Sequence, residues 1–334
     1  GLLVFFGSVQ CLHCGSTLAF VPDLFTMAAL APASQDGPDL WRRMGHRGSA
    51  DYSGRLYRMC GNRTAYDACN FAVPANDFSP LCASCRQTRV LPDLSEPANL
   101  GRWKRIESAK RQLFYTLARL GLEPAPGRAG PVFEFLADWP GGPPILTGHH
   151  GGTITLNVAE ADDGERAQRR VALGEPYRTL IGHLRHESGH FYWDQLVRDG
   201  HRLEAFRSVF GDERLDYAAA LSAHYARGND LGDWRQHHVS SYAASHPWED
   251  WAETWAHYLH MVDLLETAAS YQTSVTVPDP NAAQRHQVTD PFANPRPSFD
   301  DMVRQWVPLT LMLNSLNRSL GQNDAYPFAL SSGA

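Results

Sequence analysis

Apolar side chains recur at helical spacing in four parts of this chain and alternate with polar ones in another. The helical spacing covers residues 99–122, residues 180–194, the stretch that His246 and Pro247 open, and residues 298–319, where Ser298 and Asp301 resemble a capping box. Residues 132–136 and 153–158 are predicted to be short strands, and the second, TITLNV, alternates polar and apolar positions as a strand does. These elements predict an α+β fold whose carboxy-terminal domain is mostly helical with a small sheet.

The helix predicted over residues 180–194 contains the run His186-Glu187-Ser188-Gly189-His190. Residues four apart share a helix face, so both imidazoles can bind one ion, and Glu187 can reach a water on that ion as a general base. A glycine inside a helix costs roughly 1 kcal/mol, so Gly189 indicates that another segment or the metal site approaches closely. An HExxH string also occurs by chance, but the apolar positions around this one favour a zinc-peptidase helix.

A catalytic zinc takes three protein ligands and keeps one position open, so one more ligand must come from elsewhere. The helix that His246 and Pro247 open carries Glu249 and Glu253 on one face. One glutamate would bind zinc, and the other would accept a hydrogen bond from the free N–H of a ligand imidazole. The alternative is that both are solvent-exposed carboxylates, but the tryptophans of this helix indicate that it is mostly buried.

Two further segments are expected to border this site. His149 and His150 precede the strand over residues 153–158, and we interpret them as loop residues that line the cleft. In HExxH peptidases an edge strand in this position aligns the substrate backbone by β-addition, so we expect residues 153–158 to be that edge strand. Residues 272–297 are rich in proline and polar side chains, which predicts a long loop that forms either a cleft wall or a lid.

All six cysteines lie before residue 86, and two pairs have the Cys-x-x-Cys spacing of zinc knuckles. The predicted ligands of one structural zinc are Cys11, Cys14, Cys82 and Cys85. Cys60 and Cys69 are either a second half-site, whose partners lie upstream of Gly1, or buried thiols. Disulfides are the alternative, but nothing in the sequence indicates secretion. We therefore predict a zinc-ribbon module over residues 1–98, a connecting helix and linker over residues 99–126, and a zinc metallopeptidase domain over residues 127–334.

Charge narrows the choice of partners. The chain of 334 residues carries 30 basic and 36 acidic residues, a net charge of −6. Residues 1–100 hold eight arginines, no lysine and eight acidic residues, so the zinc ribbon has no basic surplus for nucleic acid, and a protein partner is the expected alternative.

No apolar run reaches the roughly 20 residues of a membrane helix, and residues 1–6 lack the basic start of a signal peptide. We expect a cytoplasmic protein, although the start at Gly1 suggests a fragment or a processed product.

The HExGH run, followed by Ser241-Tyr242 and then by Glu249-Asp250-Trp251-Ala252-Glu253, resembles the gluzincin metallopeptidases, particularly the catalytic domain of anthrax lethal factor. In that domain the first glutamate of an E-x-x-A-E helix is the third zinc ligand, and a tyrosine seven residues before it assists catalysis. The resemblance implies His186, His190 and Glu249 as ligands of the catalytic zinc, with Tyr242 as the assisting phenol. Glu253 is then the glutamate that orients a ligand imidazole.

The whole chain is also similar to a bacterial family called putative zinc-binding metallopeptidases, which join an amino-terminal zinc ribbon to this peptidase domain. The matching stretches are VFFGSVQCLHCG, LCASCR, AKRQLFYTLARLGL, GTITLNVAEADD, YRTLIGHLRHESGHFYW, FGDERLDY and HPWEDWAETWAHYLH. Family members usually carry a further Cys-x-x-Cys upstream of VFF, which this chain lacks, so one cysteine pair is expected to be without partners. The resemblance implies a zincin-like (gluzincin) domain after a zinc ribbon, with one catalytic and one structural zinc.

These observations favour a zinc hydrolase that cleaves peptide bonds in a peptide or protein. Glu187 would take the proton of the zinc-activated water and pass it to the leaving amine. One alternative is a non-catalytic zinc-ribbon interaction protein with a structural HExxH site, although such a site has no need of Glu187 beside an open position. The other is an amidase acting on a non-peptide substrate, which would use the same residues.

Overall fold

The computed structural model of the protein describes residues 3–45, 54–124, 129–173, 179–227, 234–277, 284–328 and 330. Contacts within the chain divide it into two compact units. Unit 1 consists of Gly1–Phe114, Val132–Thr147 and Thr155–Ala161, and unit 2 consists of Tyr115–Pro131, Gly148–Ile154 and Asp162–Ala334. Each unit contains one of the two groups of candidate metal ligands that the sequence indicated.

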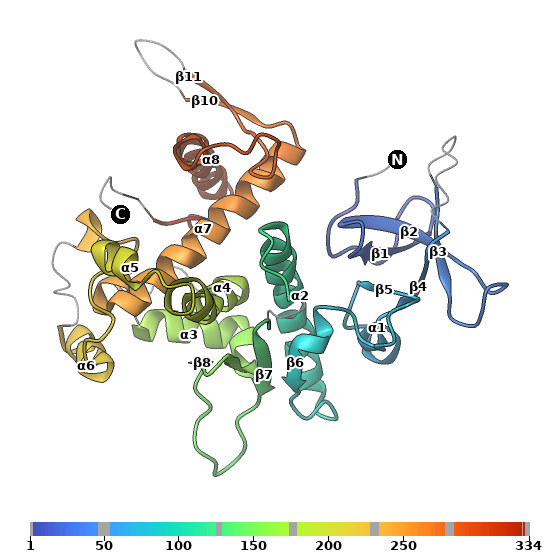
Figure 1. The fold of residues 1–334 in the computed structure, drawn as a ribbon, viewed down its shortest axis with the longest axis horizontal. Coiled ribbons are helices and arrows are strands. Elements are labelled where there is room, and N and C mark those ends of the chain that lie inside the picture. The colour runs from blue at the N-terminus through green and yellow to red at the C-terminus, as the bar shows by residue number, and fades with distance from the viewer. Residues whose placement is uncertain are drawn as a thin grey trace. The chain divides into compact units, whose positions relative to one another are not determined.

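A five-stranded antiparallel sheet forms the first part of unit 1 (Figure 1). Its strands, in spatial order, are β1 (Thr17–Val21), β2 (Thr26–Pro32), β3 (Trp41–Arg43), β4 (Leu56–Met59) and β5 (Ala72–Pro74). The register of β1 and β2 places Ala19 opposite Ala28. Both alanines belong to a buried cluster with Tyr57, which has no solvent exposure. Small side chains on two strands thus leave room for one large ring from a third.

The chain of unit 1 continues through short elements into a long helix. These elements are α1 (Gly61–Tyr66), the 3-10 helix η1 (Cys85–Gln87), β6 (Thr88–Val90) and α2 (Pro97–Arg119). α2 confirms the helix predicted over residues 99–122, and it buries Trp103 and Ile106 completely. Its polar side is partly buried as well, because Lys110 pairs with Glu107 at 3.0 Å inside the protein.

A second sheet has the strand order β6-β7-β9-β8. β7 (Val132–Leu136) and β9 (Thr153–Asn157) confirm the two predicted strands, whereas β8 (Gly148–His150) was expected to be a loop. Gly151 and Gly152 have φ angles of 54° and 83°, and this left-handed turn lets the chain fold back so that β8 pairs with β9. The predicted edge strand is therefore wrong: β9 has a neighbour on each side, and β8 is the edge.

Helices make up most of unit 2. They are α3 (Asp163–Leu173), α4 (Leu180–Trp193), α5 (Leu203–Phe210), α6 (Tyr217–Arg227), α7 (Pro247–Ser270) and α8 (Phe299–Ser319). Short turns of other helix types are η2 (Val158–Ala161, in unit 1), η3 (Asp194–Arg198, a π-helix), η4 (Trp234–Gln236) and η5 (Ala243–Ser245). α4 and α7 pack against each other more extensively than any other pair of elements (Figure 1).

Local sequence determines where these helices begin. At the start of α4, Thr179 Oγ1 accepts the N–H of Gly182 at 3.0 Å. His246 Nδ1 accepts the N–H of Trp248 at 3.1 Å, and a proline occupies the first turn of α7. Ser298 forms the predicted capping box at the start of α8, which confirms that helix.

Residues 272–297 were expected to be a long loop, and this prediction is wrong in part. β10 (Ser274–Val277) and β11 (Gln284–Gln287) pair as antiparallel strands, while residues 278–283 lie outside the described part of the chain. The prolines that suggested a loop flank these strands instead of interrupting them.

The predicted α+β fold class is confirmed. Of the helices in the described ranges, none has both the length and the apolar character that a membrane crossing requires.

Candidate metal centres

At Gly189 the backbones of α4 and α7 lie close together. A Cβ atom on Gly189 would lie 2.9 Å from the Cα of Ala252, so the missing side chain lets the two helix backbones meet, as the sequence predicted. Trp251 Nε1 donates a hydrogen bond to the carbonyl of Gly189 at 2.8 Å, and Trp255 Nε1 donates to Ser188 Oγ at 3.1 Å. The two indoles hold α7 at one position along α4 and thereby determine which of its side chains face the histidines.

His186 and His190 from α4 and Glu249 from α7 form one cluster, with ligand atoms that all lie within 4.8 Å of one another. Glu249 Oε2 is 3.0 Å from His186 Nε2 and 3.5 Å from His190 Nε2. Atoms about 2.1 Å from a tetrahedral zinc would lie about 3.4 Å apart, so these atoms have the spacing that zinc requires. Glu249 Oε2 is buried and makes no well-formed hydrogen bond within the described residues. Such a buried carboxylate oxygen is stabilised by a cation.

Glu253 lies one turn after Glu249 and contacts the other nitrogen of His186. Its Oε1 is 2.7 Å from His186 Nδ1, and its Oε2 accepts a hydrogen bond from Ser240 Oγ at 2.6 Å. When Nδ1 donates to Glu253, the lone pair of the neutral His186 is on Nε2, the atom that faces Glu249. The two glutamates thus contact different nitrogens of His186: Glu249 lies near Nε2 and Glu253 lies near Nδ1. His190 has no such partner, because its Nδ1 is buried without a hydrogen bond in the described part of the chain.

The charges of this cluster favour a bound cation. Burial lowers the pKa of His186, but Glu249 and Glu253 raise it well above its ordinary value. Burial raises the pKa of Glu249, but the two neighbouring imidazoles hold it well below its ordinary range. The carboxylates therefore stabilise positive charge between them. A divalent cation on the same nitrogen and oxygen atoms would take the place of the protons.

Glu187 is buried and is held by a residue that the sequence analysis missed. His183 Nε2 lies 3.3 Å from Glu187 Oε1, one helical turn before it. Burial raises the pKa of Glu187, but the hydrogen bond from His183 and the charges of His186 and His190 bring it below its ordinary value. A carboxylate that stays ionised beside the ligand cluster has the protonation state of a general base. The i, i+4 spacing of this pair was the signal that could have identified His183.

Two tyrosines reach the cluster from outside α4 and α7. The ring of Tyr242 packs against His186 with centroids 5.9 Å apart. Burial raises the pKa of Tyr242, and the negative charge of Glu249 raises it further. Tyr217 was missed by the sequence analysis: its hydroxyl donates to Glu249 Oε1 at 2.6 Å. The sequence indicated Tyr217 only in that this residue ends FGDERLDY, one of the matching stretches named above.

His149 lies in strand β8 beside the cluster, and not in a loop as predicted. Its ring stacks against that of His190 at a centroid distance of 6.3 Å. Its Nε2 accepts the N–H of Gly152 at 3.2 Å. Burial, with the neighbouring His190, lowers the pKa of His149 to about 4, so the ring is uncharged at neutral pH. His150, the next residue of β8, is exposed, and neither histidine belongs to the ligand cluster.

Unit 1 contains a second cluster, formed by four buried cysteines. The sulfurs of Cys60, Cys69, Cys82 and Cys85 all lie within 4.8 Å of one another. Cys69 Sγ is 3.7 Å from Cys82 Sγ and 3.6 Å from Cys85 Sγ. A tetrahedral zinc with bonds of about 2.3 Å would hold its sulfurs about 3.8 Å apart, whereas a disulfide bond is about 2.05 Å long. The four sulfurs therefore have the spacing of a tetrahedral thiolate site.

This cluster differs from the predicted ligand set of Cys11, Cys14, Cys82 and Cys85. Cys11 is half-buried, Cys14 is exposed, and neither joins the cluster. Their knuckle is present as a turn in which the N–H of Gly15 donates to the carbonyl of Cys11 at 2.8 Å. The two sets differ because α1 lies between Cys60 and Cys69 and brings both sulfurs to the second knuckle, although their spacing in the sequence has no knuckle pattern. The pair outside the cluster is thus the first knuckle.

α2 places a buried ion pair beside the cysteines. Cys85 Sγ is 3.9 Å from Glu107 Oε2, and the Glu107 carboxylate is 3.0 Å from the ammonium of Lys110. Both side chains are almost fully buried. Four thiolates on one Zn²⁺ carry two negative charges in excess, and a buried ammonium nearby offsets part of that charge.

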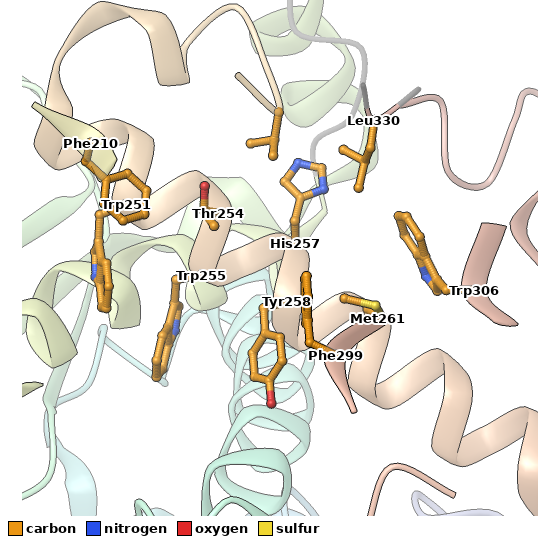
Figure 2. A pocket seen from close by; sticks show the side chains of 11 residues that line it. Phe210, Trp251, Thr254, Trp255, His257, Tyr258, Met261, Phe299, Trp306 and Leu330 are labelled. Atoms are coloured by element: carbon orange, nitrogen blue, oxygen red, sulfur yellow. The ribbon is translucent and has the colours of Figure 1, made fainter. Parts of the chain in front are cut away.

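The opposite face of α7 borders a mostly apolar cavity of about 240 Å³ (Figure 2). Trp251 and Trp255 line it together with Tyr258 and Trp306. The described residues of its wall include no carboxylate, and burial lowers the pKa of the one imidazole, His257, to about 4. The cavity therefore lacks the charged groups of a hydrolytic site, which lie on the α4 side of the helix.

Comparison with known proteins finds two family matches, one in each part of the chain. The family described as putative zinc-binding metallo-peptidase matches residues 99–334, and a zinc-ribbon domain family matches residues 1–96. An uncharacterized protein from Mycobacterium bovis is 39% identical over an alignment of 331 positions that covers 97% of this chain and 87% of that protein. Uncharacterized proteins from two strains of Mycobacterium tuberculosis have the same identity and coverage. No solved structure matches the chain.

Proposed function

Because the chain belongs to the putative zinc-binding metallopeptidase family, we propose that it is a zinc-dependent hydrolase of peptide bonds with a gluzincin-type centre. The observation that carries this proposal is the cluster of His186, His190 and Glu249, whose ligand atoms have the spacing of a zinc site with an ionised Glu187 beside them. A zinc held only for structure has four protein ligands and needs no free carboxylate. Three ligands leave a position for water and substrate.

In this proposal the metal is bound by Nε2 of His186, Nε2 of His190 and Oε2 of Glu249. Bound zinc supplies Lewis acidity, which polarises the scissile carbonyl and lowers the pKa of water. Glu253 supports the site through His186 Nδ1, at 2.7 Å. This contact keeps the ring in the tautomer whose lone pair is on Nε2 and prevents the ring from turning.

Glu187 is the proposed general base. It would take a proton from the attacking water and then donate it to the nitrogen of the leaving amine, which balances the proton over the reaction. His183, 3.3 Å away, holds the carboxylate in place and favours its ionised form. General acid–base catalysis of this kind contributes about 10²- to 10⁴-fold to the rate.

Tyr242 is the proposed donor to the oxygen of the attacked carbonyl. Its ring packs against that of His186 at a centroid distance of 5.9 Å, on the segment that leads into α7. In this proposal its hydroxyl donates to the substrate. A well-placed donor of this kind contributes about 3 kcal/mol to the stability of the transition state.

We infer that the four-cysteine cluster binds a structural zinc. The match of residues 1–96 to a zinc-ribbon domain family supports this assignment, as do the sulfur distances of 3.6 and 3.7 Å. Four thiolates leave no position for a substrate, so this ion would hold unit 1 together without taking part in hydrolysis.

Cleavage of a peptide library by the zinc-loaded protein tests the proposal. The protein should cleave a subset of the peptides, and the chelator 1,10-phenanthroline should abolish cleavage. Glu187→Gln should keep the metal and lose cleavage, whereas Glu204→Gln, an exposed carboxylate on α5 with 94% of its side chain accessible, is the matched control. A zinc-loaded wild-type protein that cleaves no peptide would contradict the proposal, and cleavage that survives Glu187→Gln would contradict the assigned base.

A further inference from the structure

The two oxygens of the Glu249 carboxylate have different neighbours. Oε2 faces His186 and His190, whereas Oε1 accepts a hydrogen bond from the hydroxyl of Tyr217 at 2.6 Å. The glutamate is only 1% exposed, so Tyr217 takes the place of water at Oε1. A carboxylate that can turn freely can offer a metal one oxygen or both. When a phenol holds the second oxygen, one oxygen remains for the metal.

Tyr217 is held in this position by residues at the start of α7. Its ring meets the rings of His246 and Trp248 edge to face, at centroid distances of 5.3 and 6.0 Å. His246 Nδ1 accepts the N–H of Trp248, so its Nε2 carries the proton and donates to the carbonyl of Leu215 at 3.1 Å. One imidazole thus connects the segment before α6 to the helix that carries Glu249. The position of the phenol and that of the carboxylate are therefore set together.

The exposure of Tyr217 argues against a role in packing alone. The residue is 38% exposed, which is more than any residue of the buried core, yet its hydroxyl is directed at a buried carboxylate. A tyrosine that only covered apolar surface would gain little from this hydroxyl, because phenylalanine covers the same area. The contact with Oε1 is the feature that phenylalanine would not reproduce.

We propose that Tyr217 is a positioning residue of the metal site: it keeps Glu249 a one-oxygen ligand and so preserves the open position that substrate needs. The inference rests on the proposed function, since it takes Glu249 as the third ligand. Partners that hydrogen-bond a metal ligand typically change metal affinity by about 10- to 100-fold when they are removed. Loss of this phenol should weaken zinc binding in that range and free Oε1 to approach the metal.

Tyr217→Phe tests this proposal, with Tyr271→Phe as the matched control, because Tyr271 is 56% exposed after the end of α7. Zinc affinity of the three-ligand site is measured by chelator competition after the cysteine cluster has been loaded. Tyr217→Phe should bind zinc about 10-fold more weakly or worse, and Tyr271→Phe should match the wild type. With Co²⁺ in the site, visible absorption should fall in Tyr217→Phe as a second carboxylate oxygen joins the metal.

The same substitution in a Glu249→Ala background separates positioning from a general effect on folding. If Tyr217 acts through Glu249, Tyr217→Phe should have no further effect on zinc affinity there. An equal loss in both backgrounds, or wild-type affinity and an unchanged Co²⁺ spectrum in Tyr217→Phe, would overturn the proposal. These readouts do not require catalysis, so a wild-type protein that binds zinc but cleaves nothing would count against the proposed function alone.

Discussion

The two clusters differ in the number of ligands they offer and in the groups that surround them. In unit 1, four buried cysteines direct their sulfurs to one point, beside a buried ion pair. In unit 2, two histidines and a glutamate form the cluster, and an ionised Glu187 lies beside it. The same ion would therefore be closed off in one unit and open to substrate in the other. Ligand number and neighbouring groups, not the metal, make this difference.

The clusters also differ in how the surrounding chain is stabilised. Near the cysteines the elements are short, and α1, which separates Cys60 from Cys69, has no buried residue. The proposed ligands of unit 2 lie on helices of 14 and 24 residues, which pack through Trp251 and Trp255. A metal should thus be required for folding around the cysteines, whereas the other cluster should keep its shape without metal.

The largest effect should follow from removing a cysteine of the four-cysteine cluster. Cys69→Ser removes one of four ligands, and structural zinc contributes on the order of 10 kcal/mol in small zinc domains. We expect the substituted protein to lose one zinc per chain and residues 1–96 to become sensitive to protease. Metal analysis and limited proteolysis measure the two changes.

Cys14→Ser is the matched control for that experiment, because Cys14 is exposed and lies outside the cluster. It should keep the metal content and the protease resistance of the wild type. If Cys14→Ser loses zinc and Cys69→Ser does not, the ligand set first predicted from the sequence is right and the cluster in the structure is not the zinc site.

The site in unit 2 was largely predictable because its spacing is local. His186 and His190 are four residues apart on one helix, and Glu249 and Glu253 repeat that spacing on another, so helical periodicity alone places each pair on one face. Gly189 indicated that a second segment approaches, and α7 is that segment. Tyr217 could not be predicted in this way, because its distance from Glu249 depends on how α6 packs and not on periodicity.

The cysteine ligands were less predictable because they depend on tertiary contacts. Two knuckles of equal spacing suggested each other as partners, but the structure joins the second knuckle to Cys60 and Cys69, which are nine residues apart in the sequence around α1. The prediction that residues 153–158 form the edge strand was wrong for a similar reason. The Gly151-Gly152 turn adds β8 outside β9, and three residues are too few for an alternating pattern.

The next largest effect should come from a substitution of Glu187, beside the cluster of His186, His190 and Glu249. Glu187→Gln keeps the shape of the side chain but removes its ability to accept a proton, so kcat should fall by about 10³-fold. Zinc content should not change, because Glu187 is not in the ligand cluster. Steady-state kinetics with a peptide identified from the library, together with metal analysis, measure both. A fall in zinc content that accounts for the lost activity would make Glu187 a ligand and remove it as the base.

Tyr242→Phe should have a smaller effect on the same step. The phenol is expected to act mainly in the transition state, so kcat should fall by about 10²-fold while zinc affinity and thermal stability stay close to those of the wild type. Kinetic measurements and a melting curve separate these quantities. Unchanged turnover, or a loss of activity that follows from a lower melting temperature, would mean that Tyr242 serves the packing around His186 and not the reaction.

A still smaller effect should come from Glu253→Gln, which changes a partner of the metal site without removing a proposed ligand. The amide oxygen can still accept the Nδ1–H of His186, but it is a weaker acceptor than the carboxylate that now lies 2.7 Å away. Zinc affinity should therefore fall by only about 10-fold, the lower end of the range for such partners. Ser240→Ala, which removes the other contact of Glu253, should cost less, and Glu249→Ala, which removes a proposed ligand, should cost far more. Chelator competition measures all three affinities. If Glu249→Ala keeps full zinc content while Glu253→Ala loses it, the two glutamates have exchanged roles, and the hydrogen bond from Tyr217 would then orient a group that does not bind the metal.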